Sequence, residues 1–196
     1  MSDIPSVLLK IKKKKESEVD ELYNSGKVLE YEMRVADAPP PRDFTTAISK
    51  PGRNLIAEFK KASPSEGEIR PGAEPEEIAQ LNERCGASAI SVLTDSYFFD
   101  GEIDYLRRVR NTVTLPILRK DFIIHHAQIY EARVYGADAV LLIDALLESS
   151  QIKDYIALAD SLGMSCLVES HDESELEKAV EVVQKSLALI IEIFID

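Results

Sequence analysis

Four charged residues stand at the ends of short apolar runs, which is where enzymes built on parallel strands carry reactive groups. Glu58 and Lys60 lie two residues apart in LIAEFKKASPS, so both side chains point to the same side of an extended strand. Lys120 ends the run PILRK, and Glu169 ends the run SCLVE. If these lysines and carboxylates converge, they could perform general acid–base chemistry, bind an anion or form a Schiff base.

Each charged residue also has an ordinary explanation, because charges at strand ends are commonly just solvated. Lys61 is adjacent to Lys60, and one of these two lysines must be a solvated residue without a role in the site. We interpret His125 and His126 as surface residues of a loop or helix start, and nothing requires a role for His171. The His, Cys and Asp residues lack the spacing of a metal site, so we expect neither a metal nor another cofactor.

The elements that must position these residues alternate regularly. Apolar runs typical of buried parallel strands begin at Leu55, Ala89, Pro116, Ala139, Ser165 and Leu187. Helical stretches separate them, and several end in glycine, as in GAS, GAD and LGM. The first run is not followed by Gly-x-Gly-x-x-Gly, which argues against a dinucleotide-binding sheet. The pattern predicts an α/β fold of the (β/α)8 barrel type, here incomplete, with about six strands and with strands 7 and 8 absent.

The N-terminal part reads differently from the rest. Apolar residues over 4–23 have helical spacing, and the proline-rich ADAPPPRD (Ala36–Asp43) indicates a rigid linker. We therefore expect a helical extension and linker over 1–45 and the partial barrel over 46–196. We interpret the basic run KIKKKKE (Lys10–Glu16) as the solvated face of a helix.

Composition limits the possible partners and the cellular location of the protein. The chain has 196 residues, 45% of them hydrophobic, and a net charge of −12, so it repels nucleic acid and anionic membranes. Cys85 and Cys166 are interpreted as buried free thiols in a reducing compartment. The N-terminus lacks the apolar core of a signal peptide, and the apolar runs are too short to span a membrane. We expect a cytoplasmic protein.

Several motifs together resemble the indole-3-glycerol phosphate synthase family of tryptophan biosynthesis. They are LIAEFKKASPSEGEIR, GASAISVLTDSYFFDG, LPILRKDFIIHHAQIYEARVYGADAVLLI and GMSCLVESHDESELEKA. The resemblance keeps the family's order and spacing from about Ile4 to Val182. It implies a monomeric carbon–carbon lyase that closes the indole ring of 1-(2-carboxyphenylamino)-1-deoxyribulose 5-phosphate, with loss of carbon dioxide and water.

The resemblance also assigns roles to residues. Lys120 becomes the general acid of ring closure, Glu169 and Lys60 serve the dehydration, and Glu58 orients and tunes the lysines. It implies that the N-terminal helix helps to cover the substrate. Two further residues are expected to line the substrate site, Ser63 and Phe99.

The chain departs from the family pattern mainly at its end. Glu66 stands where the family often has Lys or Arg, and Asp95 replaces the commoner Glu. The sixth strand LALIIEIFID lacks the asparagine of the family's IIGINNRDL. QKSLALIIEIFI can be back-translated with permitted codons into a DNA string. When that string is read again from its third base, it encodes EIIGINNRDLY. We therefore expect a frameshift near residue 183, between Val182 and Gln184, and a chain that is truncated, poorly soluble or inactive.

Two other functions remain open at this point. One is a phosphate-binding barrel aldolase that forms a Schiff base on Lys120. The other is a non-catalytic barrel fragment, which the missing asparagine and strands favour.

Overall fold

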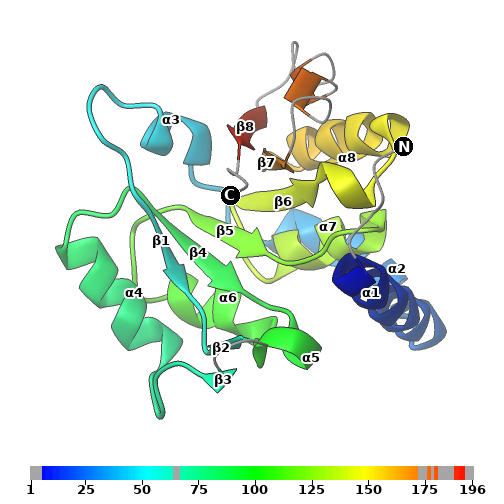
Figure 1. Ribbon diagram of the computed structural model, residues 1–196, viewed down its shortest axis with the longest axis horizontal. Coiled ribbons are helices and arrows are strands. Elements are labelled where there is room, and N and C mark those ends of the chain that lie inside the picture. Colours follow the sequence, from blue (N-terminus) through cyan, green and yellow to red (C-terminus); the bar gives the residue numbers. More distant parts are fainter. Residues whose placement is uncertain (1–5, 64–66, 172–175, 178, 181–187, 193–196) are drawn as a thin grey trace.

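A parallel sheet organises the molecule. The computed structural model describes the chain except residues 1–5, 64–66, 172–175, 178, 181–187 and 193–196. Six strands pair in parallel in their order along the chain: β1 (Ile56–Phe59), β4 (Ala89–Leu93), β5 (Ile117–Lys120), β6 (Ala139–Ile143), β7 (Ser165–Ser170) and β8 (Ala188–Glu192). The sheet curves and carries helices on its outer side (Figure 1). All six predicted strands are confirmed, and so is the fold class of an incomplete barrel.

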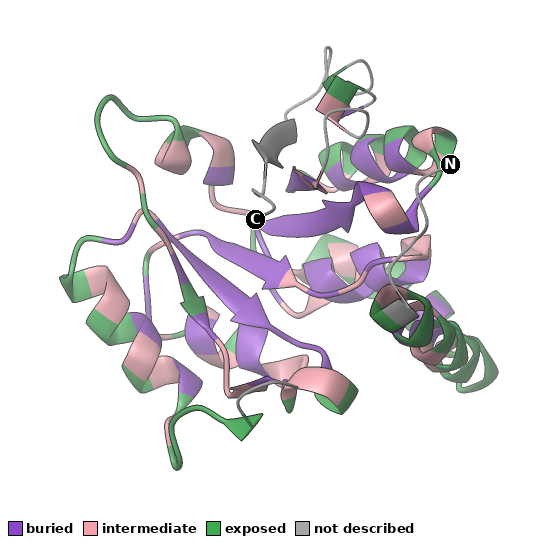
Figure 2. Ribbon diagram, in the orientation of Figure 1, coloured by how far each residue is buried: buried purple, intermediate pink, exposed green. Residues whose placement is uncertain are grey.

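Burial explains why the strands form where they do. Every residue of β4 and β6 is buried, as near-continuous apolar strands between covered faces should be (Figure 2). The core includes Ile90, Ile117 and Leu142, each fully buried. Removing this apolar surface from water is the main stabilising term of the fold.

Helices connect successive strands. They are α4 (Pro75–Arg84), α5 (Ser96–Phe99), α6 (Asp104–Arg110), α7 (His126–Val134), the 3-10 turn η2 (Asp144–Leu146) and α8 (Ser149–Ser161). Gly136, just after α7, has a φ of 90°, a left-handed value that suits a helix C-terminus and favours glycine. The helix expected over ESELEKAVEVV lies only partly within the described residues, of which 176–177 and 179–180 are helical.

The N-terminal extension contributes α1 (Ser6–Asn24), α2 (Lys27–Arg34) and the 3-10 turn η1 (Val35–Asp37) before α3 (Phe44–Ile48). The predicted first helix is therefore confirmed, and it packs beside α2 and α7. The interpretation of the basic run as solvated is wrong for Lys15, which is only 2% exposed. The division into parts at residue 45 stays a prediction.

Two local features differ from expectation or were not anticipated. β2 (Ala62–Ser63) and β3 (Gly67–Glu68) form a short antiparallel pair after β1. Both cysteines are free thiols, but the expected burial is wrong for Cys85, which is exposed at the C-terminal end of α4, while Cys166 is buried in β7. Burial raises the pKa of the Cys166 thiol to about 12, so this thiol stays protonated at neutral pH.

Candidate active site

A cavity of about 290 Å³ opens where the strands end. The lining comes from β1, β4, β5, β6 and β7, from residues just after β1 and β5, and from the end of α5: Glu58, Lys60, Leu93, Phe99, Lys120, Asp121, Phe122, Leu141, Ile143 and Glu169. The carboxyl ends of parallel strands meet at one edge of the sheet, so these side chains converge although they are far apart in sequence. The structure thus brings together the four charged residues that strand-end positions single out.

The four charges form a chain of ion pairs. Lys60 Nζ lies 3.7 Å from Glu58 Oε1, and Lys120 Nζ lies 3.7 Å from Glu58 Oε2. Lys120 Nζ also lies 3.8 Å from Glu169 Oε2. Lys120 therefore sits between two carboxylates, and Glu58 sits between two lysines. Each group is placed to affect the protonation of its neighbours through charge.

The charges differ in how far they are exposed. The side chain of Glu169 is 13% exposed, whereas those of Glu58 and Lys120 are 32% and 34% exposed. His171 Nε2 lies 3.3 Å from Oε1 of Glu169. The partly open lysines can meet a ligand, while Glu169 stands deeper against the sheet.

Two aromatic rings form an apolar wall of the cavity. Phe99 ends α5 and Phe122 follows β5, and their rings stack with centroids 6.1 Å apart and planes inclined by 29°. Gly101 allows this arrangement: a Cβ there would lie 2.5 Å from the backbone oxygen of Leu93, so the chain can fold back onto β4 only with glycine. Sequence reasoning had found Phe99 but not Phe122, although Phe122 closes the motif KDF.

The other expected site residues lie nearby or elsewhere. Ser63 is buried in β2, which packs against α5, and is not among the described residues that line the cavity. Lys61 is the ordinary member of its pair, since its Nζ contacts Asp100 at 2.7 Å on the surface. His125 caps α7 instead of facing the cavity. Glu66 and the position of the expected frameshift lie outside the described residues.

The described residues contain no group of three or more His, Cys, Asp or Glu that could hold a metal ion. No helix among them is long and apolar enough to cross a membrane.

A parallel α/β sheet with paired acids and bases at its carboxyl edge defines an enzyme of the (β/α)-barrel class. The family model for indole-3-glycerol phosphate synthase matches residues 8–188. The chain belongs to this family, an enzyme family of tryptophan biosynthesis whose members are carboxy-lyases and take a phosphorylated substrate.

Individual relatives agree. The indole-3-glycerol phosphate synthase of Pelodictyon phaeoclathratiforme is 49% identical over 178 residues, which cover 90% of this chain and 70% of the relative. That of Desulfotalea psychrophila is 50% identical over 181 residues, covering 92% of this chain and 68% of the relative. A Sinorhizobium meliloti protein assigned as an isomerase has a TM-score of 0.56 at 13% identity, covering 74% of this chain and 36% of that protein, and supports the fold alone.

Proposed function

We propose that the cavity catalyses the ring closure of 1-(2-carboxyphenylamino)-1-deoxyribulose 5-phosphate to indole-3-glycerol phosphate, with Lys120, Glu169, Lys60 and Glu58 as its catalytic residues. The observation that carries the proposal is the chain of ion pairs in which Lys120 contacts both Glu58 and Glu169 inside one cavity. The reaction needs a proton donor and a proton acceptor on one substrate, and this arrangement supplies both.

Lys120 acts first, as the general acid. When the aromatic carbon attacks the sugar carbonyl, a C–C bond forms and the carbonyl oxygen takes a proton from the Lys120 ammonium. The carboxylate on the attacking aromatic carbon then leaves as carbon dioxide, and its bonding electrons restore the aromatic ring. Glu58 and Glu169 stabilise the charged form of Lys120 until the proton is transferred.

The dehydration uses the other pair. The new hydroxyl leaves as water after it takes a proton from Lys60, and Glu169 accepts a proton from the ring methylene carbon next to the nitrogen, so that the carbon–carbon double bond forms and the nitrogen keeps its hydrogen. Glu58 holds Lys60 and Lys120 in place. Phe99 packs on the aromatic part of the substrate, its anthranilate moiety. Ser63, in the neighbouring strand β2, supports the substrate site from beside the cavity.

The setting proposed for this activity is a monomer in the cytoplasm that binds neither nucleic acid nor membrane. The net charge of −12 supports the absence of anionic macromolecules as partners.

Single-turnover kinetics test the proposal. The chain is mixed in excess over substrate, and product is followed by indole fluorescence. We expect Lys120→Met to lower the rate of ring closure by about 10² to 10⁴, the usual contribution of general acid–base catalysis. Glu169→Gln should slow the dehydration and let the ring-closed, decarboxylated intermediate accumulate. Lys61→Met, which changes the adjacent surface lysine, is the matched control and should leave the rate unchanged.

Two outcomes would contradict the proposal. The first is a wild-type chain that neither binds nor converts the substrate, which would favour the expectation that this chain is inactive or a non-catalytic barrel fragment. The second is borohydride trapping of a keto substrate on Lys120, which would assign the cavity to Schiff-base chemistry instead.

A further inference from the structure

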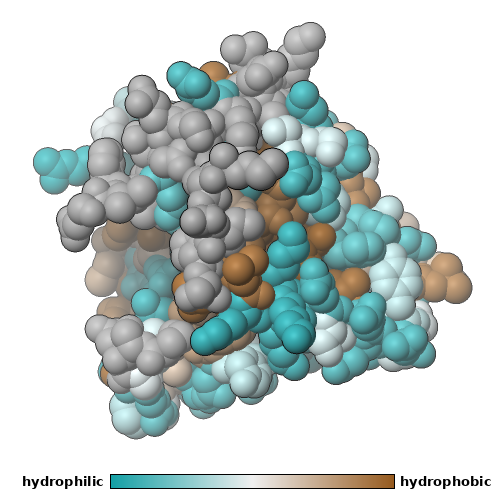
Figure 3. Space-filling model, turned by 45° about the vertical axis from the view of Figure 1, so that its right-hand side comes forward, coloured by the Kyte–Doolittle hydropathy of each residue, from teal (hydrophilic) through white to brown (hydrophobic). Residues whose placement is uncertain are grey.

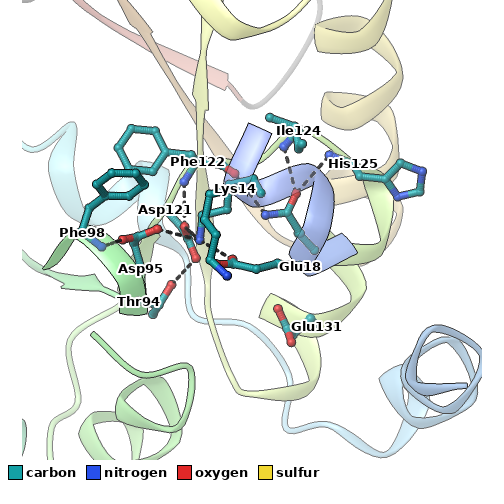
Figure 4. A network of polar contacts seen from close by, with 12 residues as sticks. Lys14, Glu18, Thr94, Asp95, Phe98, Asp121, Phe122, Ile124, His125 and Glu131 are labelled. Carbon is teal, nitrogen blue, oxygen red and sulfur yellow. Dashed lines mark hydrogen bonds and ion pairs between the residues drawn. The ribbon is translucent and has the colours of Figure 1, made fainter. Parts of the chain in front are cut away.

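One lysine of the N-terminal helix is buried behind the cavity. The Nζ atom of Lys15 lies 2.8 Å from carboxylate oxygens of three residues, Glu18, Asp95 and Asp121. Burial opposes the charge of Lys15, but Asp121 and Asp95 outweigh it and raise the pKa of this lysine. Figure 4 shows the two aspartates turned toward each other beside α1. The helix thus places a permanent cation between the ends of β4 and β5.

Asp121 connects this cation to the reacting lysine. It follows Lys120 directly, and its Oδ1 also accepts the backbone N–H of Phe122 at 2.8 Å. Its Oδ2 accepts from Thr94 Oγ1 at 2.7 Å and from the Arg119 guanidinium at 2.9 Å. Burial alone would raise the pKa of Asp121, but Arg119 and Lys15 lower it, so the carboxylate stays charged. The backbone that carries Lys120 and Phe122 is therefore fixed by a fully bonded carboxylate.

Asp95 connects the same cation to the opposite wall. Its Oδ1 accepts the backbone N–H of Phe98 at 2.7 Å and so caps α5, whose last residue is Phe99. Its Oδ2 contacts Lys15 at 2.8 Å. Phe99 stacks on Phe122 across the cavity wall. Among the described residues, Lys15 is the cation that contacts both aspartates.

We propose that Lys15 is a positioning residue of the active site, which holds Phe99 and the Lys120–Phe122 segment in register through a buried Asp95–Lys15–Asp121 bridge. The inference rests on the function proposed for the cavity, and it gives the N-terminal helix a task inside the reaction. Without the cation, two buried carboxylates that now share it would repel each other. The segments that they hold, α5 and the Lys120–Phe122 backbone, would then move apart, and with them the two aromatic rings.

Fluorine NMR tests this geometry without requiring turnover. The chain is labelled with 4-fluorophenylalanine, and the resonances of Phe99 and Phe122 are assigned by single Phe→Leu changes. In Lys15→Met we expect both resonances to shift and broaden, while those of the core residues Phe44 and Phe59 stay in place. Lys13→Met is the matched control, because Lys13 lies only two residues away on the same helix and is exposed. It should leave all resonances unchanged.

A second variant is needed because Lys15→Met itself can unfold the chain. Asp95→Asn keeps an oxygen that can cap α5 but removes the charge that Lys15 holds. We expect it to shift the Phe99 resonance as well, and to lower the rate of ring closure by about 100-fold, as small misplacements in active sites do.

Three results would overturn the inference. In the first, Phe99 and Phe122 keep their resonances in folded Lys15→Met while its melting temperature falls, which would make Lys15 an anchor of stability only. In the second, Asp95→Asn leaves the Phe99 resonance in place. In the third, Lys13→Met gives the same shifts as Lys15→Met. Failure of the catalytic proposal would appear separately, as unchanged kinetics in Lys120→Met.

Discussion

At the scale of single residues, the cavity and the network behind it hold their charges differently. Contacts of Lys120 with Glu58 and Glu169 are 3.7 and 3.8 Å long, beyond hydrogen-bond length. The contacts of Lys15 are all 2.8 Å. Contacts of this length leave the groups able to bind substrate. The short contacts of Lys15 instead hold the neighbouring segments in fixed positions.

Asp138 also holds its neighbours through short contacts, here at the N-terminal ends of the strands. It is fully buried and accepts from the backbone N–H groups of Arg42 and Ile117 and from the Arg110 guanidinium, at 2.6 to 2.8 Å. Asp138→Ala leaves these donors unpaired, and we expect a loss of about 3 to 5 kcal/mol in unfolding free energy, measured by urea denaturation.

The matched control is Asp104→Ala. This change removes an exposed ion pair with Arg107 within α6 and should hardly move the urea midpoint. A similar loss in both variants would show that Asp138 contributes no more than a surface charge does.

Sequence could locate the cavity residues but not the scaffold behind them. Glu58, Lys120 and Glu169 stand out because charges interrupt or end apolar strands. Lys15 is hidden in a basic run, although it lies four residues from both Ile11 and Val19 on the buried face of α1. Its partners are distant in sequence, and pairing of this kind cannot be read from helical spacing.

At the scale of elements, continuous apolar runs predict the strands well because both faces of the sheet are covered. The pair β2–β3 escaped prediction, since strands of two residues carry no periodic signal. Helix ends were visible where glycine follows, as at Gly163, whose φ is 75°. The cap of α7 was not visible, because histidine is not a usual capping residue.

This histidine cap makes a prediction for pH. His125 Nδ1 accepts the backbone N–H of Ala127 at 3.3 Å, which requires an unprotonated nitrogen. Burial, and then the neighbouring His126, lower the pKa of His125 below its ordinary value. As pH falls through about 6.5, the unfolded chain binds a proton before the folded chain does, so this contribution to stability is present above that pH and is lost below it.

Replacing the histidine tests the linkage. His125→Asn supplies a good cap that does not titrate. When the pH is lowered from about 7.5 to about 5.5, the urea midpoint of the variant should therefore fall less than that of the wild-type chain. Equal pH dependence in both chains would show that the cap does not titrate.

At the scale of the whole molecule, the site has to attract an anionic substrate against a net charge of −12. Hydrophilic side chains cover much of the face drawn in Figure 3, with hydrophobic ones gathered near its centre. Lys60 and Lys120 are balanced by Glu58 and Glu169 within the cavity, so attraction depends on local geometry more than on the overall field.

The strands that line the cavity also differ in how many neighbouring strands they pair with. β4 to β7 each lie between two neighbours, whereas β1 has a neighbour on one side only among the described strands. We therefore expect amide hydrogen exchange to be slowest in β4 and β6, for example at Ile90 and Val140, and faster in β1. Because Glu58 lies on β1 and Lys120 on β5, substrate that bridges them should slow exchange in β1 most. Uniform protection on binding, or slow exchange in free β1, would show that the sheet responds as one unit and that the two sides of the cavity are equally rigid.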